Sequence, residues 1–241
     1  EIESILVLTK DSDHFHSTLY VSPRDTSKEI WEGIRLGVEG ALDWPVNKSE
    51  SIDEFENNLA KLTQDYQNIF SISGISKRLD YLLKDQESSD PKPFLDSLRK
   101  IKSPKEIEYI ARAAEICSNG KISAMRKSKP GIGEWEIQSI IESTFIKSRS
   151  NWSFPSIVGG GDNATILHYK SNNSIINDGD LVLVDSGCEV FGYASDITRT
   201  WPINGKFSPP QKTLYELVLL AQEKAIAKCI VGNTLKDVHQ T

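Results

Sequence analysis

Two aspartates, Asp185 and Asp196, occupy positions from which neighbouring strands can bring their carboxylates together. Residues 181–184, just before Asp185, form an apolar run of branched residues, which predicts a strand buried on both sides. Alternation along residues 193–198 places Asp196 and Thr198 on one face of a second strand. Burying a lone ionised carboxylate is costly, so paired acids in an apolar setting imply cations, arginines or a shared proton. The segment therefore indicates a carboxylate site for hard cations.

Each acid also has an ordinary interpretation, because a lone aspartate at a strand end is usually a turn former or a surface group. The combination is much rarer than either acid alone. The two acids are spaced for two strands and a tight turn, and Asp196 is followed closely by the run Thr-Arg-Thr-Trp-Pro. Arg199 in that run has two interpretations, an ion pair with a buried acid or a solvent-exposed position.

A third element lies upstream, where three glycines at 159–161 precede an apolar and aromatic stretch that contains His168. Glycines allow a close backbone approach or a sharp turn. They do not form a phosphate-binding loop here, because neither the P-loop lysine nor the G-x-G-x-x-G spacing is present. A histidine in a half-buried strand finds hydrogen-bond partners easily, so His168 taken alone is more often structural. Beside the two acids, a catalytic role stays open.

These residues together carry a family resemblance. Segment 154–202, with its Leu-His-Tyr, Asp-Ser-Gly and Asp-Ile-Thr-Arg-Thr-Trp-Pro motifs, resembles the metal-dependent Xaa-Pro aminopeptidases (aminopeptidase P) of the pita-bread fold. The likeness is greatest to their mitochondrial branch, Xaa-Pro aminopeptidase 3 and the intermediate-cleaving peptidase. It extends through most of the chain, including segments 31–35, 101–107, 204–208 and 211–216.

The resemblance implies a site for two divalent metal ions. Asp185 and Asp196 would be the first two of five ligands, with Asp196 bridging the ions, and His168 would hold the peptide and stabilise the tetrahedral intermediate. Carboxylate oxygens suit Mn²⁺, Mg²⁺ or Ca²⁺ better than zinc, and Mn²⁺ is the first choice. Thr198 is interpreted either as a hydrogen-bond donor that orients Asp196 or as a β-branched strand former.

One departure from the family pattern is serious. The family completes its site with a histidine in a His-Gly-x-Gly-His context and two glutamates, and the sequence reaches Thr241 without them. After Asp196 it has only His239, Glu216 and Glu223, and the two glutamates fit a solvated helix face. We therefore expect a fragment truncated at both ends, since the sequence also starts without methionine. We expect this fragment alone to be inactive.

Composition excludes several classes of protein. The 241 residues, 38% hydrophobic and 26% charged, suffice for one large or two modest domains. A net charge of −6 leaves no basic footprint for nucleic acid, and no apolar run reaches the length of a membrane span. Three scattered cysteines do not make a disulfide framework and favour a reducing compartment.

The pattern divides the chain near residue 90. Residues 1–90 are typical of an α/β piece, which the resemblance assigns to part of the N-terminal domain of an aminopeptidase P, and the polar segment 84–92 suits a linker. In residues 95–241, helices precede strands joined by hairpins, which indicates an α+β fold. The resemblance assigns this part to the N-terminal half of a pita-bread metallopeptidase domain. His14 and His16 are expected in a polar loop, because no third metal ligand lies nearby.

The function expected is hydrolysis by a metal-dependent aminopeptidase that releases one N-terminal residue, before proline or from mitochondrial processing intermediates. Its partners would be peptide or protein N-termini, with no nucleic acid and no membrane; a homodimer and a monomer both stay open. Mitochondrial localisation is preferred, with the cytoplasm as the alternative. A non-catalytic pita-bread module that binds peptides or proteins is the alternative function. A prolidase or methionine aminopeptidase would share the acids, but the upstream α/β piece favours aminopeptidase P.

Overall fold

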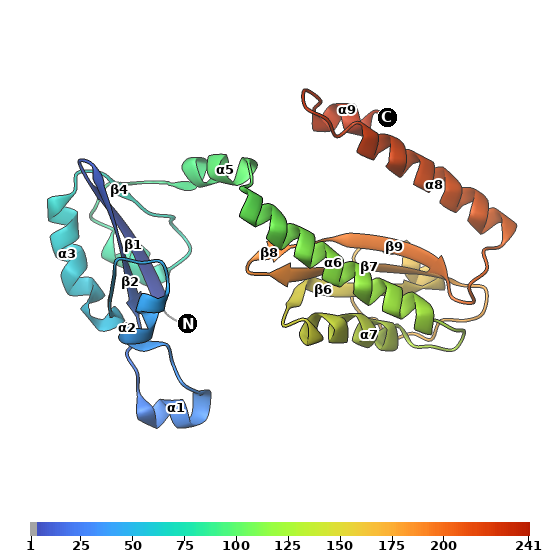
Figure 1. The fold of residues 1–241 in the computed structure, drawn as a ribbon, viewed down its shortest axis with the longest axis horizontal. Helices are drawn as coiled ribbons and strands as arrows, with labels where there is room; N and C mark the ends of the chain where they lie inside the picture. Colours follow the sequence, from blue (N-terminus) through green and yellow to red (C-terminus); the bar gives the residue numbers. More distant parts are fainter. Residues whose placement is uncertain (1–3) are drawn as a thin grey trace. The chain divides into compact units, whose positions relative to one another are not determined.

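The computed structural model describes residues 4–241, which form two compact units that divide between Ile101 and Lys102 (Figure 1). Each unit has its own cluster of buried apolar side chains. The division falls at the end of a helix, α5 (Lys92–Lys100), rather than in the polar segment before it. An edge-to-face contact of Phe94 with Phe70, with ring centroids 5.9 Å apart, joins this helix to the first unit.

The first unit is built on a three-stranded sheet. Strand β1 (Ser4–Asp11) pairs antiparallel with β2 (His14–Val21), and β2 pairs in parallel with β3 (Lys48–Ser51). His14 and His16 are exposed on β2, so the expectation of a polar loop is wrong: the hairpin turn takes only two residues. The β2–β3 connection holds α1 (Thr26–Glu32), α2 (Gly37–Gly40) and η1 (Ala41–Asp43).

The rest of the first unit covers this sheet and adds a small second one. Tyr20 and Phe55 are buried and stack edge to face, with centroids 5.1 Å apart, where α3 packs on the sheet. The remaining elements are η2 (Ile52–Glu54), α3 (Phe55–Asp65), β4 (Ile69–Phe70), α4 (Lys77–Leu82) and β5 (Ser88–Ser89). Strands β4 and β5 pair in parallel. The segment expected to be a linker therefore contributes β5 to the first unit.

The second unit is an antiparallel sheet with helices packed on it. Strand β7 pairs with β6 on one side and with β8 and then β9 on the other. Helices α6 and α7 lie against β7 and β6 (Figure 1). The elements are α6 (Pro104–Lys127), α7 (Glu134–Lys147), β6 (Asn151–Gly160), η3 (Gly161–Thr165), β7 (Leu181–Val190), β8 (Tyr193–Ala194), β9 (Ile197–Pro202), α8 (Pro209–Ala227) and α9 (Leu235–His239).

Local signals set the start of α6. The Ser103 hydroxyl accepts a bond from the Glu106 backbone N–H, and the Glu106 carboxylate accepts one from the Ser103 N–H at 2.6 Å. Pro104 occupies the first turn, where its missing N–H costs nothing. The core beneath this helix gathers side chains from α6, α7 and the sheet, among them Cys117, Ile137, Ile141, Phe145, Val158, Val182 and Val184. The helices thus hold β7, the strand that carries Asp185.

Candidate metal centre

Strand β7 places Asp185 on the side of the sheet opposite α6. Val184 and Ser186, its neighbours in the strand, are buried, and the Ser186 hydroxyl accepts a bond from Lys121 of α6 at 2.8 Å. Because side chains alternate along a strand, Asp185 points the other way and is half-buried. Its Oδ1 atom is buried and has no hydrogen-bond partner among the described residues. An unpartnered buried carboxylate oxygen is costly, so this atom fits a ligand.

Asp196 meets Asp185. Asp196 is exposed overall, but partial loss of solvent around its carboxyl is the main cause that raises its pKa, and the charge of Asp185 and a side-chain hydrogen bond with Asp185 raise it further. The positive charge of Lys121 opposes the shift. The two acids expected to converge therefore do so, and close enough to compete for protons. Two neighbouring carboxylates repel each other, and a shared proton or a cation between them relieves that repulsion.

Asp196 is not inside a strand, as alternation predicted, but in a break between β8 and β9. The break arises because Ser195 turns inward: its Oγ donates to the Ala113 carbonyl at 3.1 Å and accepts from the Cys188 N–H at 3.0 Å. The Ser195 carbonyl then crosses Gly187 so closely that a Cβ there would lie 1.9 Å from it. Glycine at 187 is therefore required for the chain to present Asp196 beside Asp185.

The structure places Thr198 directly opposite Asp185 in the β7–β9 register. On one face of an antiparallel pair, such residues are direct neighbours. The Thr198 hydroxyl makes no hydrogen bond within residues 4–241, so its expected orientation of Asp196 stays a prediction. Arg199 is exposed and donates to the Thr198 carbonyl at 2.7 Å, which supports the solvent-exposed interpretation of this residue.

His168 lies in a turn after η3, not in the half-buried strand expected for it. Its side chain is exposed, and within the described part of the chain no hydrogen bond or ion pair links it to Asp185 or Asp196. The strand is absent because β6 ends at Gly160 and Gly161 takes a φ of +54°, which turns the backbone into a short helix. The exposed imidazole is free to contact a ligand.

Sequence reasoning missed two buried charged residues in this unit. Lys121 of α6 is 2% exposed, and its ammonium donates to Ser186 Oγ at 2.8 Å and to the Val184 carbonyl at 3.2 Å. Burial lowers the pKa of Lys121 to about 8, although the nearby charges of Cys117, Asp185 and Asp196 act in the opposite direction. The available signal was periodicity, because Lys121 follows Cys117 at helical spacing on the buried face.

The second missed residue is Glu134, which is fully buried at the start of α7 and accepts four hydrogen bonds, one from the last residue of β6 and three from the segment that follows it. Its position just before the helix predicted at 135–147 made it resemble an ordinary first-turn acid. Nothing local distinguishes it, because all four donors come from residues at least 26 positions away.

The acid pair fits a divalent cation. Both groups supply hard carboxylate oxygens, the kind that such cations prefer. Asp185 Oδ1 is buried without a hydrogen-bond partner among the described residues, and the charge of Asp185 helps to raise the pKa of Asp196. Residues 4–241 contain no group of three or more histidine, cysteine, aspartate or glutamate side chains arranged to hold a metal. Among the described residues the pair therefore supplies two carboxylates, fewer groups than a metal centre ordinarily has.

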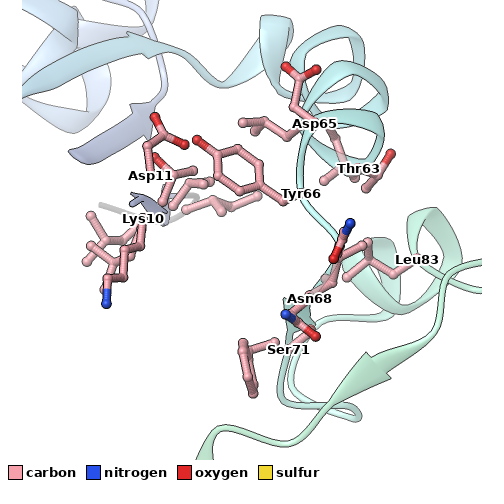
Figure 2. A pocket seen from close by; sticks show the side chains of 18 of the residues that line it. Lys10, Asp11, Thr63, Asp65, Tyr66, Asn68, Ser71 and Leu83 are labelled. Atoms are coloured by element: carbon pink, nitrogen blue, oxygen red, sulfur yellow. The ribbon is translucent and has the colours of Figure 1, made fainter. Parts of the chain in front are cut away.

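A separate cavity of about 700 Å³ lies in the first unit, lined by β1, the end of α3 and β4 (Figure 2). Figure 2 shows Tyr66 between Asp11 and Asp65, with Asn68 and Ser71 further along the wall. Most of its remaining lining is aliphatic, and it contains none of the residues predicted to act in catalysis. It offers no convergent set of ligands or nucleophiles.

Comparison with known proteins assigns the family. The model of metallopeptidase family M24 matches residues 108–241, and that of the aminopeptidase P N-terminal domain matches residues 1–70. The chain therefore belongs to metallopeptidase family M24. Within it, the chain is 42% identical to an Xaa-Pro aminopeptidase of Haemophilus influenzae, over 99% of this chain and 57% of that protein. It is 34% identical to human Xaa-Pro aminopeptidase 3, over 99% of this chain and 51% of the relative.

Solved structures agree with this assignment. A variant of Escherichia coli aminopeptidase P in complex with substrate superposes with a TM-score of 0.93 at 34% identity, over 98% of this chain and 58% of that one. Proline aminopeptidase P II from Yersinia pestis gives a TM-score of 0.92 at 35% identity, over 98% of this chain and 59% of that one. These matches confirm the expected resemblance and the incomplete pita-bread fold. The chain spans somewhat more than half the length of these relatives.

No helix in residues 4–241 is both long enough and apolar enough to cross a membrane.

Proposed function

We propose that the protein containing this chain is a metallo-aminopeptidase that hydrolyses the first peptide bond of a substrate, with Xaa-Pro N-termini as the preferred class. The observation that carries the proposal is the contact of Asp185 with Asp196 beside an unpartnered buried carboxylate oxygen. Such a pair is destabilised without a cation and fits one well. The names of the relatives, Xaa-Pro aminopeptidases from bacteria to human, support the reaction and the substrate class.

Each residue has a distinct part in the proposed reaction. Asp185 and Asp196 hold the divalent ions, whose chemistry when bound is to polarise the scissile carbonyl and to activate water. His168, exposed on the turn after η3, contacts the bound peptide and donates to the oxygen that gains negative charge. Thr198, opposite Asp185 in β9, keeps the carboxylates oriented through its hydroxyl.

The metal and the compartment are finer parts of the proposal. Mn²⁺ is preferred because the two ligands present are both carboxylates, and a hard donor set of this kind suits Mn²⁺ better than zinc. A mitochondrial location is preferred because relatives at 34% identity include a mitochondrial intermediate cleaving peptidase of Arabidopsis thaliana. The same relative supports processed protein N-termini as a second substrate class.

The test uses the full-length protein with Asp185→Asn or Asp196→Asn. Hydrolysis of an Xaa-Pro peptide and the metal content of the purified protein should both fall to background, while circular dichroism and cooperative unfolding are kept. Glu189→Gln is the matched control, because Glu189 is an exposed acid of the same strand and should leave both quantities unchanged. Wild-type hydrolysis in either aspartate variant would refute the proposal. A full-length protein that binds peptides without metal or hydrolysis would favour the non-catalytic binding module.

A further inference from the structure

Glu134 is a fully buried carboxylate with an unusual set of partners. Its Oε1 accepts from the Gly160 N–H at 2.8 Å and from Asn163 Nδ2 at 3.0 Å. Its Oε2 accepts from the Tyr169 hydroxyl at 2.9 Å and from the Ser174 N–H at 2.9 Å. All four donors belong to one stretch of chain, residues 160–174, which connects β6 to β7 and contains His168.

We propose that Glu134 is a positioning residue that fixes this stretch, here called the His168 loop (residues 160–174), and thereby sets where the His168 imidazole stands. The inference deepens the proposed function and rests on it for the role of His168. Glu134 itself does not contact substrate. It acts through the loop.

The chemistry of the partners requires a carboxylate. Four N–H or O–H groups converge on two oxygens, and an ionised carboxylate can accept all four bonds. Glutamine of the same shape would turn an NH₂ group toward one pair of donors. Each pair includes a backbone N–H, which cannot accept a bond, so at least one donor would be left unpaired in a buried place. The negative charge is compensated by these charge-assisted bonds and by the N-terminal end of α7, where Glu134 is the first residue.

The bonds bracket His168 closely. Tyr169, held by Glu134, is its immediate neighbour, and the Tyr169 hydroxyl also accepts from Asn163 Nδ2 at 3.0 Å. The two hydrogens of Asn163 Nδ2 are shared among Glu134 Oε1, the Tyr169 hydroxyl and Ser174 Oγ, the last at 3.1 Å, so Asn163 ties the start of the loop to its end. The loop is therefore anchored through the side chains of Asn163 before His168 and Tyr169 after it, while the His168 side chain remains exposed. A fixed backbone with a free imidazole is the arrangement that a substrate-contacting histidine needs.

The same bonds connect the loop to the strand of the acid pair. Gly160, whose N–H Glu134 accepts, ends β6 and pairs with Val182 of β7, three residues before Asp185. The Glu134 backbone N–H also donates to the Ser174 carbonyl at 3.0 Å, so the first residue of α7 is hydrogen-bonded to the C-terminal end of the loop as well. One buried carboxylate thus fixes the loop relative to the sheet that carries Asp185.

The first arm of the test uses the full-length protein and needs no activity. In Glu134→Gln, amide hydrogen exchange of the His168 loop should accelerate by about ten- to a hundredfold, the size expected when bonds to a charged group are lost. Exchange in β7 and α6 should stay as in wild type. Glu136→Gln is the matched control, because Glu136 is an exposed acid of the same helix turn whose side chain caps only Gly133. Unchanged loop exchange in a folded Glu134→Gln variant would overturn the inference.

Tyr169→Phe covers the case in which Glu134→Gln fails to fold. It removes one of the four donors and keeps the carboxylate, so loop exchange should accelerate in the same direction by a smaller factor. Exchange as slow as in wild type would again overturn the inference.

The second arm uses the full-length protein and separates positioning from general stability. Glu134→Gln should lower kcat/KM, and the double variant Glu134→Gln/His168→Ala should be no slower than His168→Ala alone, because the loop then has no imidazole left to position. Multiplied losses in the double variant would overturn the inference. If the wild-type full-length protein hydrolyses nothing, the proposed function fails, and the exchange arm still decides whether Glu134 holds the loop.

Discussion

At the residue scale, the central feature is a pair of like charges in contact. The folded chain raises the pKa of Asp196 above its ordinary value of 3.8 through burial first and Asp185 second. An acid with a raised pKa binds its proton more tightly when folded. Its contribution therefore favours the fold at low pH and is lost as pH rises from the ordinary value through the raised one. At neutral pH the repulsion between the two groups, weakened by solvent because Asp196 is exposed, opposes folding unless a cation lies between them.

Replacing Asp185 should lower the pKa of Asp196. In Asp185→Asn, the pKa of Asp196 should fall only partway toward its ordinary value, because burial, the largest cause, remains while the charge of Asp185 is gone. A pH titration of the Asp196 carboxyl carbon by NMR measures this. Glu189→Gln, on the same strand, should leave the titration unchanged. An Asp196 titration in Asp185→Asn identical to wild type would contradict the contact between the two acids.

Lys121 gives a second prediction at this scale, with the opposite dependence on pH. Its pKa is about 8 in the folded chain, below the ordinary 10.5, so the unfolded chain binds more protons between these values. The free energy of unfolding should therefore rise with pH across that window, by about 2–3 kcal/mol at about 1.4 kcal/mol per pKa unit.

The measurement compares urea unfolding of wild type and Lys121→Met at pH 7.5 and pH 10.5. The difference between them should shift in favour of wild type at the higher pH, and comparison with the variant cancels other titrating groups. Lys127→Met, at the exposed end of the same helix, should show no such shift. If the difference in free energy of unfolding between wild type and Lys121→Met is the same at both pH values, burial does not lower the pKa of Lys121.

At the element scale, the crossing of the β8–β9 connection over β7 sets the geometry of the acids. A Cβ at Gly187 would lie 1.9 Å from the Ser195 carbonyl oxygen and 2.3 Å from Ser153 Oγ. The first of these is backbone and cannot rotate away. The strands must separate to admit even a methyl group, and that movement would carry Asp196 away from Asp185.

Gly187→Ala should therefore lower the free energy of unfolding by about 1–3 kcal/mol, as overpacking does, and shift the pKa of Asp196 down. Gly192→Ala is the matched control in the adjoining turn: it has open space around the new methyl and a φ of +82°, so it should cost only the left-handed conformation, about 1 kcal/mol. Denaturant unfolding and the pH titration of Asp196 are measured for both glycine variants. Equal effects of the two substitutions would contradict the close crossing.

How much the sequence predicts depends on whether the determining contacts are local. The capping box at Ser103 and Glu106, the strand through residues 181–184 and the convergence of two acids all follow from nearby residues, and all are present. The break before Asp196 was not predictable, because it depends on the bond of Ser195 to Ala113, 82 residues away. Alternation nevertheless gave the correct face for Asp196, since the break preserves the side on which it projects.

The loop of His168 shows the same limit more strongly. The apolar character of residues 166–169 indicated a strand, yet the segment is a turn whose shape depends on Glu134 in a different element. Composition around residue 90 suggested a linker, but the pairing of Ser88–Ser89 with β4 and the contact of Phe94 with Phe70 are long-range contacts that local polarity does not reveal. In each case a distant partner decided the structure.

At the scale of the whole molecule, two self-contained units differ in what they can do alone. The first has its own apolar core and no convergent set of catalytic groups among its described residues. The second has the acid pair, the His168 loop and the helices that support both. Helix α8 of this unit buries none of its own residues, and Leu214, Leu217 and Val218 on it are exposed. The relatives extend well beyond the span that this chain matches.

The last prediction follows from the ligand set. Two carboxylates without further ligands should bind Mn²⁺ only weakly, with a dissociation constant of about 10⁻⁴ M or more by analogy with sparse hard-cation sites. Residues 1–241 alone should therefore show no cleavage of an Arg-Pro-Pro peptide, because ions held so loosely and by so few groups are not positioned for attack on a carbonyl. Calorimetric titration with Mn²⁺ measures the dissociation constant, and a peptidase assay of the same preparation measures cleavage. Asp185→Asn/Asp196→Asn should abolish even the weak binding, and any cleavage by residues 1–241 that this double variant lacks would show that two ligands suffice.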